Sequence, residues 1–154
     1  MLEKHENKKS VQIHRIYIKN ISFETPNVPQ IFQRYWDPKI KLHINTTSSQ
    51  ILDNMYQVIL CITVTATIST DTAFLCEVQQ GGIFSLNNIQ KKYQIEHILG
   101  SYCPNLLFPY ARECISNLIW RGTFPSLHLE PIDFESFFLK NTPEPTNTES
   151  SQDR

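Results

Sequence analysis

The strongest structural signal in this sequence is a run of alternating residues at positions 58–68. The run reads VILCITVTATI, in which apolar side chains at even positions alternate with a second set that includes three threonines. A period of two in β-branched residues is typical of a strand. The run is far shorter than the roughly 20 residues that a membrane-spanning helix needs. We therefore expect a long strand in a folded core and no membrane insertion.

Three other segments carry strand patterns. Residues 39–44 alternate polar with apolar side chains, as in a strand with one wet face. Residues 73–80 alternate in the same way. In residues 11–24 the shared parity of the apolar residues is broken by Ile16 and Ile18, which a bulge or a strand middle buried on both faces would explain. The sequence thus predicts a sheet of four strands.

The strand predicted at residues 73–80 divides its side chains between two faces. A turn at residues 69–71 would join it to the preceding strand as a hairpin, and Gly81 with Gly82 would let it bend or end. One face carries Phe74, Cys76 and Val78, and the other carries Leu75, Glu77 and Gln79.

The second half of the chain has helical periodicity. Within residues 106–120 apolar side chains recur every three or four positions; Pro109 suits a first helical turn and Gly122 the position after the end. This pattern predicts one amphipathic helix that covers one face of the sheet. Residues 87–99 form a second helix candidate. Asp133 is suited to cap a short terminal helix that carries Phe134, Phe137 and Phe138.

The chain is expected to form a single domain over residues 11–141. Residues 1–10, MLEKHENKKS, are polar and charged and lack the apolar middle of a secretory signal peptide, so we expect a flexible segment and a cytoplasmic protein. Residues 142–154, TPEPTNTESSQDR, contain no large apolar side chain, which predicts a disordered tail.

Composition argues against several classes of function. A formal net charge of −1 and a pI near 6.5 provide no basic surplus for nucleic acid. The chain has four glycines and no phosphate-binding GxxxxGK[ST] or GxGxxG motif. Neither CxxC nor HExxH occurs, and the pair His97 and Cys103 would need metal ligands from elsewhere. No cofactor and no metal are therefore expected.

A thiol enzyme is the serious alternative from another class. Cys103 lies just before the long predicted helix, whose N-terminus would lower the pKa of a thiol. The sequence identifies neither a partner base nor an oxyanion hole for it. A Cys103-dependent enzyme acting on a small substrate stays open beside the binding functions.

The predicted elements leave surplus apolar surface. One long and two short helices cannot cover both faces of a four-stranded sheet, and self-association is the expected remedy. The oligomer contact would use Phe74, Cys76 and Val78, or the outer face of the long helix, unless both pack within the monomer. An aromatic segment at residues 30–36, QIFQRYW, is either folded onto its own core or part of a binding surface.

Several ordered runs resemble the bacterial protein-export chaperone family SecB. They are RIY at residues 15–17, NISFE at 20–24, TAFLCEVQQGGIF at 72–84, YCPNLLFPYARECI at 102–115 and RGTFP at 121–125. The resemblance spans roughly residues 12–138. It implies an α+β protomer with a four-stranded antiparallel sheet, helices packed on one face, and assembly as a dimer of dimers. It also implies an ATP-independent chaperone that holds unfolded preproteins in apolar grooves and delivers them to the SecA motor ATPase.

The resemblance also assigns residues to two surfaces. Asn20 departs from the family's usual aspartate, and residues 87–94 also differ from the family pattern. An oligomeric peptide-binding adaptor without an export role stays open as a third reading. The positions implied for SecA binding, on an acidic sheet face, are Asn20, Glu24, Leu75 and Glu77; those for client binding are Trp36, Ile40, Leu42, Ile44 and Phe137.

Overall fold

The computed structural model describes residues 8–141. Residues 1–7 and 142–154, on which the predictions of flexible ends mostly fall, lie outside the described residues. Within the segment predicted to be flexible, the Lys8 carbonyl accepts a hydrogen bond of 3.0 Å from the side chain of Asn88. The first strand begins at Ser10.

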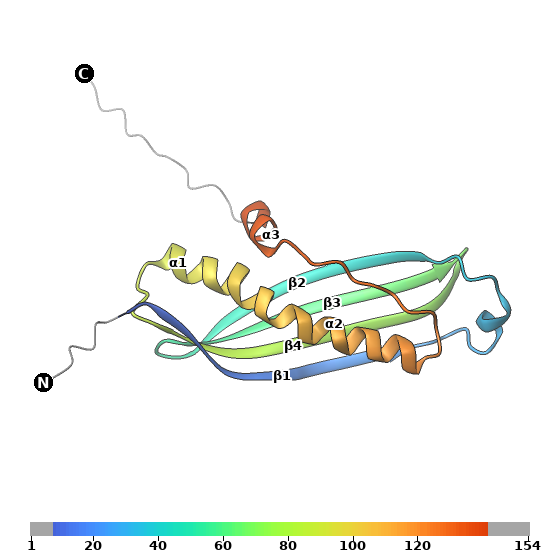
Figure 1. The fold of residues 1–154 in the computed structure, drawn as a ribbon, viewed down its shortest axis with the longest axis horizontal. Helices are drawn as coiled ribbons and strands as arrows, with labels where there is room; N and C mark the ends of the chain where they lie inside the picture. The colour runs from blue at the N-terminus through green and yellow to red at the C-terminus, as the bar shows by residue number, and fades with distance from the viewer. Residues whose placement is uncertain (1–7, 142–154) are drawn as a thin grey trace, which may run out of the picture.

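Four antiparallel strands form one sheet, as the strand patterns predict (Figure 1). The order across the sheet is β1-β4-β3-β2, so β1 and β2 are the two edge strands. Both hairpins join neighbours in the chain, and Ser69 adopts a positive φ of 54° in the predicted turn between β3 and β4. The strands are β1 (Ser10–Glu24), β2 (Lys39–Leu52), β3 (Met55–Ile68) and β4 (Asp71–Asn87).

β1 contains the irregularity that its sequence pattern predicts. Its register with β4 shifts between Ile13 and Arg15 and again between Ile18 and Asn20. Each shift is a bulge, which turns following side chains to the other face. The broken parity at Ile16 and Ile18 therefore reflects bulges.

Two predicted strands are too short. β2 runs on through NTTSSQIL, a polar stretch without alternation, because β3 supplies its hydrogen-bonding partner throughout. β4 does not end at Gly81 and Gly82 but passes through them to Asn87. A Cβ atom on Gly81 would lie 2.6 Å from the ring of Tyr17. These glycines allow close packing of side chains against the strand.

The helical half of the chain is longer and more continuous than its pattern predicts. α1 (Lys92–His97), a π-helical turn (Ile98–Tyr102) and α2 (Cys103–Arg121) follow one another without a break. Pro109 therefore lies inside the helix, whereas Gly122 follows its last residue as predicted. α3 (Phe134–Asn141) is capped by Asp133, whose two carboxylate oxygens accept from the Ser136 amide at 3.1 Å and hydroxyl at 2.7 Å.

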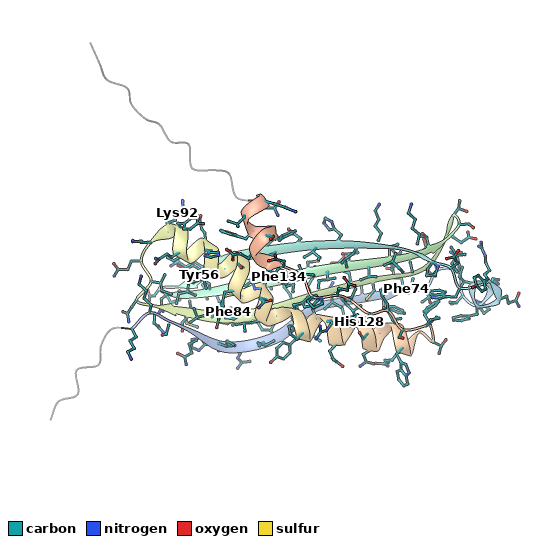
Figure 2. The ribbon with its side chains drawn as sticks, turned by 45° about the horizontal axis from the view of Figure 1, so that its top comes forward. Tyr56, Phe74, Phe84, Lys92, His128 and Phe134 are labelled. Atoms are coloured by element: carbon teal, nitrogen blue, oxygen red, sulfur yellow. The ribbon has the colours of Figure 1, made fainter. Side chains whose placement is uncertain are left out.

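The core lies between α2 and the faces of β3 and β4. The inner face of α2 is formed by Leu107, Ala111, Ile115 and Ile119, which are completely buried. Phe84 lies toward the α1 end of the sheet and Phe74 toward the opposite end (Figure 2). Among residues 8–141, no helix is long and apolar enough to cross a membrane.

The predicted oligomer contact through Phe74, Cys76 and Val78 is wrong. These side chains are 1%, 1% and 0% exposed in the isolated chain, because they point from β4 into the core beneath α2. The alternative, packing within the protomer, is correct for this strand.

Candidate functional site

The inner face of β2, on the side that carries α2, is left open to solvent. Directly opposite residues of an antiparallel pair point to the same face of a sheet. Ile40, Leu42 and Ile44 lie opposite Ala66, Val64 and Ile62, which are completely buried. Ile40 and Leu42 are nevertheless 36% and 45% exposed, because α2 packs on β4 and β3. We call these three side chains the β2 track.

α3 stands beside this track and makes it one side of a groove. Leu42, Ile44 and Phe137 line a common space of about 640 Å³ between β2 and α3. A neighbouring space of about 320 Å³ continues along Thr46 and reaches Gly100. We call the two spaces together the β2–α3 groove. The structure thus brings together three of the five residues implied for client binding.

Trp36 is placed differently from the other implied client-binding residues. It precedes β2 and is half-buried, with its ring centroid 5.6 Å from that of Phe124. The segment around it folds partly onto the core, since Ile31 is 3% exposed. Phe32 and Tyr35 of the same aromatic segment are 49% and 87% exposed. The segment therefore packs partly on the core and leaves aromatic surface in contact with water.

The four residues implied for SecA binding share the opposite face of the sheet. Glu24 lies opposite Leu75, while Asn20 and Glu77 each lie opposite a polar neighbour on the adjoining strand. Their strands are paired and their side chains alternate with buried ones, so the four positions form one surface on β1 and β4. We call it the β1–β4 face.

On this face of the sheet, acidic side chains lie on β1 and β4, and lysines lie on β2. Glu77 accepts a hydrogen bond of 3.0 Å from Gln79, and Glu24 is exposed at the end of β1. Lys39 and Lys41 lie opposite outward-facing threonines of β3 and so occupy the same face at its far edge. The expected acidic surface is therefore confined to the β1–β4 half.

Cys103 does not have the environment that a nucleophilic thiol needs. Its side chain is completely buried, and α2 continues backward into the π-helical turn, so no free helix N-terminus faces the sulfur. Burial raises the pKa of the Cys103 thiol to about 12. The expectation of a lowered pKa is wrong, and the case for a Cys103-dependent enzyme loses its physical basis.

A second groove, which the sequence did not reveal, runs between β1 and α2. It has a volume of about 700 Å³. Ile18 and Ile21, on the β1 side, are 50% and 39% exposed. The broken parity of β1 was the available signal, since bulges had turned apolar residues toward an edge. The apolar lining of this groove consists of Ile16, Ile18 and Ile21 from β1, Pro109, Cys114 and Leu118 from α2, and the rings of Tyr17 and Tyr110.

These features define an α+β protein of one sheet, covered on part of one face by a long helix, with an open apolar groove along an edge strand. The chain belongs to the SecB family, since the family model described as Preprotein translocase subunit SecB matches residues 4–144. Members of this family are chaperones rather than enzymes, which supports a chaperone role.

Solved structures that are similar to this chain include the following two. One is a SecB-like chaperone from Mycobacterium tuberculosis, solved in complex with a ChAD peptide from the HigA1 antitoxin. It is 16% identical, with a TM-score of 0.65 over 79% of this chain and 90% of that one. The other is a protein of unknown function from Streptococcus agalactiae, 8% identical, with a TM-score of 0.48 over 80% of this chain and 98% of that one.

Proposed function

We propose that this chain is an ATP-independent cytoplasmic chaperone that holds unfolded preproteins and delivers them to SecA. The observation that carries the proposal is the β2 track, a row of apolar side chains left in contact with water beside an edge strand. Exposed contiguous apolar surface of this kind marks a site of interaction.

The geometry of the track suits an extended client chain. From Ile40 to Ile44 it spans about 13 Å, the length of four strand residues. Phe137 gives the groove a second apolar side. A client with apolar residues at every second position would place them against the track while its polar residues stay in water. Recognition would depend on this pattern and on extension, which only an unfolded chain offers.

Tight holding would come from several grooves in one assembly. We propose a dimer of dimers, in which one long client chain occupies the grooves of different protomers. Once the first segment is bound, each later contact is intramolecular and benefits from a high effective concentration. The exposed edge of β1 and its groove with α2 support such self-association, since unpaired strand edges favour pairing with another chain.

The holdase function is tested by placing a charge on the β2 track. Leu42→Glu should weaken the binding of a denatured preprotein by at least about tenfold, because the carboxylate would have to be buried against the client. Leu42 is 45% exposed, so the fold should survive. Lys41→Glu, on the opposite face of the same strand and outside the lining of the groove, is the matched control. If both variants hold the preprotein equally well, the β2–α3 groove is not the client-binding site.

Delivery to SecA is tested on the β1–β4 face. Glu24→Lys with Glu77→Lys should slow association with purified SecA, most strongly at low salt, and leave client holding unchanged. Lys39→Glu with Lys41→Glu, on the far edge of the same sheet face, is the control. A wild-type protein that holds clients but shows no affinity for SecA would favour the adaptor without an export role.

A further inference from the structure

α3 is attached to the rest of the protein through one polar cluster. His97 Nε2 lies 2.7 and 2.6 Å from the two carboxylate oxygens of Glu135. The Ser101 hydroxyl donates a hydrogen bond of 2.7 Å to the same carboxylate. Glu135 lies on α3, His97 at the end of α1, and Ser101 in the π-helical turn. One carboxylate therefore joins α3 to the helical run at the point where its winding changes.

Aromatic packing surrounds this cluster. The Phe138 ring centroid lies 5.1 Å from that of His97 and 6.4 Å from that of Tyr93. Gly100 leaves room for the ring, since a Cβ atom there would lie 2.5 Å from Phe138. We call the surface formed by Tyr93, His97, Gly100 and Ser101 the α3 seat.

The seat controls the groove because the next residues of α3 line it. Phe137 and Asn141 border both spaces of the β2–α3 groove, and Phe137 faces Leu42 and Ile44 across the larger one. A shift of α3 would remove the apolar ring of Phe137 from the lining of this larger space.

We propose that His97 and Glu135 are positioning residues, which hold α3 as a wall of the client groove more firmly when His97 is protonated. This inference rests on the proposed holdase function and adds a pH dependence to it. Client affinity should rise as pH falls from about 8.5 to 6, within the range over which histidine changes its charge.

The sign follows from the groups around His97. Hydrogen bonds from Ser101 and then from His97 hold the pKa of the Glu135 carboxyl below its ordinary value, so this carboxylate stays charged over the whole range. A hydrogen bond between imidazolium and carboxylate is stronger than one from neutral imidazole. His97 and Glu135 border a cavity of about 480 Å³, whose other titratable groups are Tyr102 and Asp133 and to which β1 contributes only Val11. On α1, Tyr93 stacks on His97, and Glu96 is paired with Lys92.

The expected size of the effect is small. The side chains of His97 and Glu135 are 38% and 50% exposed. A partly solvated ion pair changes an equilibrium by about two- to fivefold. Client affinity of the wild-type protein should therefore be about two- to fivefold higher at pH 6 than at pH 8.5.

Two substitutions at His97 separate charge from packing. His97→Gln keeps a neutral donor, and it should fix client affinity at the lower, high-pH level. His97→Arg keeps a positive charge that can pair with both oxygens of Glu135, and it should fix affinity at the higher level. His14→Gln is the matched control, because His14 bonds Ser85 on the sheet and is remote from α3.

The experiment measures affinity for a fluorescent unfolded preprotein at both pH values, together with amide hydrogen exchange of residues 134–141 relative to wild type at the same pH. Faster exchange of α3 in His97→Gln at pH 6, and not at pH 8.5, is expected. A wild-type pH dependence that persists in His97→Gln would overturn the inference. If wild-type protein binds no client at either pH, the proposed function fails, and the exchange data still decide whether His97 positions α3.

Discussion

At the level of single side chains, the four cysteines differ sharply in their access to water. Cys76 on β4 and Cys103 at the start of α2 are buried, while Cys61 on β3 and Cys114 on α2 are partly exposed. Burial, followed by the neighbouring Cys114, raises the pKa of the Cys76 thiol to about 12. Reactivity of the protein toward thiol reagents should therefore depend on position.

The first prediction concerns thiol labelling. With a maleimide at pH 7, Cys61 and Cys114 should react first. Cys103 should react only after unfolding, because burial keeps its thiol protonated and keeps the reagent away from the sulfur. Mass spectrometry of peptides after short exposures measures the order. Early modification of Cys103 would restore the enzyme reading.

The second prediction concerns stability at alkaline pH. The pKa values of Cys76 and Cys103 are about 12 in the folded protein against an ordinary value of 9.0. The unfolded chain therefore loses these protons first, so the stabilisation is complete below pH 9 and is lost as pH rises toward 12. Each thiol should contribute at most about 1.4 kcal/mol per pH unit to this loss.

The measurement is urea unfolding at pH 8 and pH 10.5. A Cys76→Ala, Cys103→Ala double variant should lose less free energy of unfolding between the two values than the wild-type protein does. A Cys61→Ala, Cys114→Ala variant is the control for the exposed thiols. Identical pH slopes in the wild-type protein and the buried-pair variant would contradict the prediction.

The third prediction concerns Asn20, where the family resemblance implies an aspartate. Asn20 is exposed on the β1–β4 face opposite Gln79, so Asn20→Asp adds a carboxylate without burying it. Association with SecA should become several-fold faster at low salt, because added charge complementarity acts mainly on the encounter rate. Stopped-flow binding measures it, with Asn105→Asp on the helix side as control. A rate unchanged by Asn20→Asp would place the SecA contact elsewhere.

At the level of strands and helices, α3 is the element whose position matters most to the groove. Its seat includes Gly100, a helical glycine against the ring of Phe138. In an exposed helix, glycine to alanine stabilises by roughly 1 kcal/mol. Here the added methyl group would meet the ring of Phe138, which must then shift although it is packed against His97 and Tyr93.

The fourth prediction is therefore that Gly100→Ala loosens α3 although it favours the helix that contains it. Hydrogen exchange should become faster in residues 134–141 and slower or unchanged in residues 98–110. Client affinity should fall together with α3 protection. If α3 is as protected as in the wild-type protein, the close contact with Phe138 does not limit its position.

Sequence patterns predicted the elements better than their ends. Alternation identified the strands because successive side chains of a strand point to opposite faces of the sheet, and β3 and β4 bury one of these two sets. Asp133 and Gly122 marked helix boundaries through local hydrogen bonding. The second half of β2 carried no pattern, since its residues are polar on both faces and depend on β3 for pairing. Pro109 was misleading because the helix begins upstream, where the sequence gives no capping signal.

The candidate site was predictable only in part. Leu42, Ile44 and Phe137 meet as the family resemblance implies, but no local pattern says that α2 stops short of β2. Phe74 was misassigned to an oligomer contact because alternation separates two faces without saying which one a helix covers. The His97–Glu135 contact joins residues 38 positions apart and could not be inferred from spacing.

For the assembled protein, the two edge strands offer different surfaces. β1 carries exposed isoleucines and forms a groove with α2, whereas β2 carries the track beside α3. We assign self-association to the β1 edge and client binding to the β2 edge. In this division the β1–α2 groove is used for assembly, and the β2–α3 groove of each protomer stays open to a client.

The fifth prediction tests this division. Ile18→Lys should reduce the molar mass measured by light scattering below that of the wild-type protein, for which we propose a tetramer, because a charge would be placed in the proposed interface. Leu42→Lys, at a comparably exposed position on the other edge, should leave the mass unchanged while client holding falls. If instead Leu42→Lys lowers the mass and Ile18→Lys weakens client holding, then β2 is the edge for self-association and β1 the edge for client binding.

The width of the sheet has a consequence for how the protein works. Four strands at about 4.8 Å spacing are wider than one helix of about 10 Å diameter, so α2 cannot shield the whole inner face. The receptive surface is thus built into the architecture and is present from the moment the chain has folded. If the protein works as proposed above, the groove needs no opening step before a client binds, and the turnover of clients would be set by the partner that removes them.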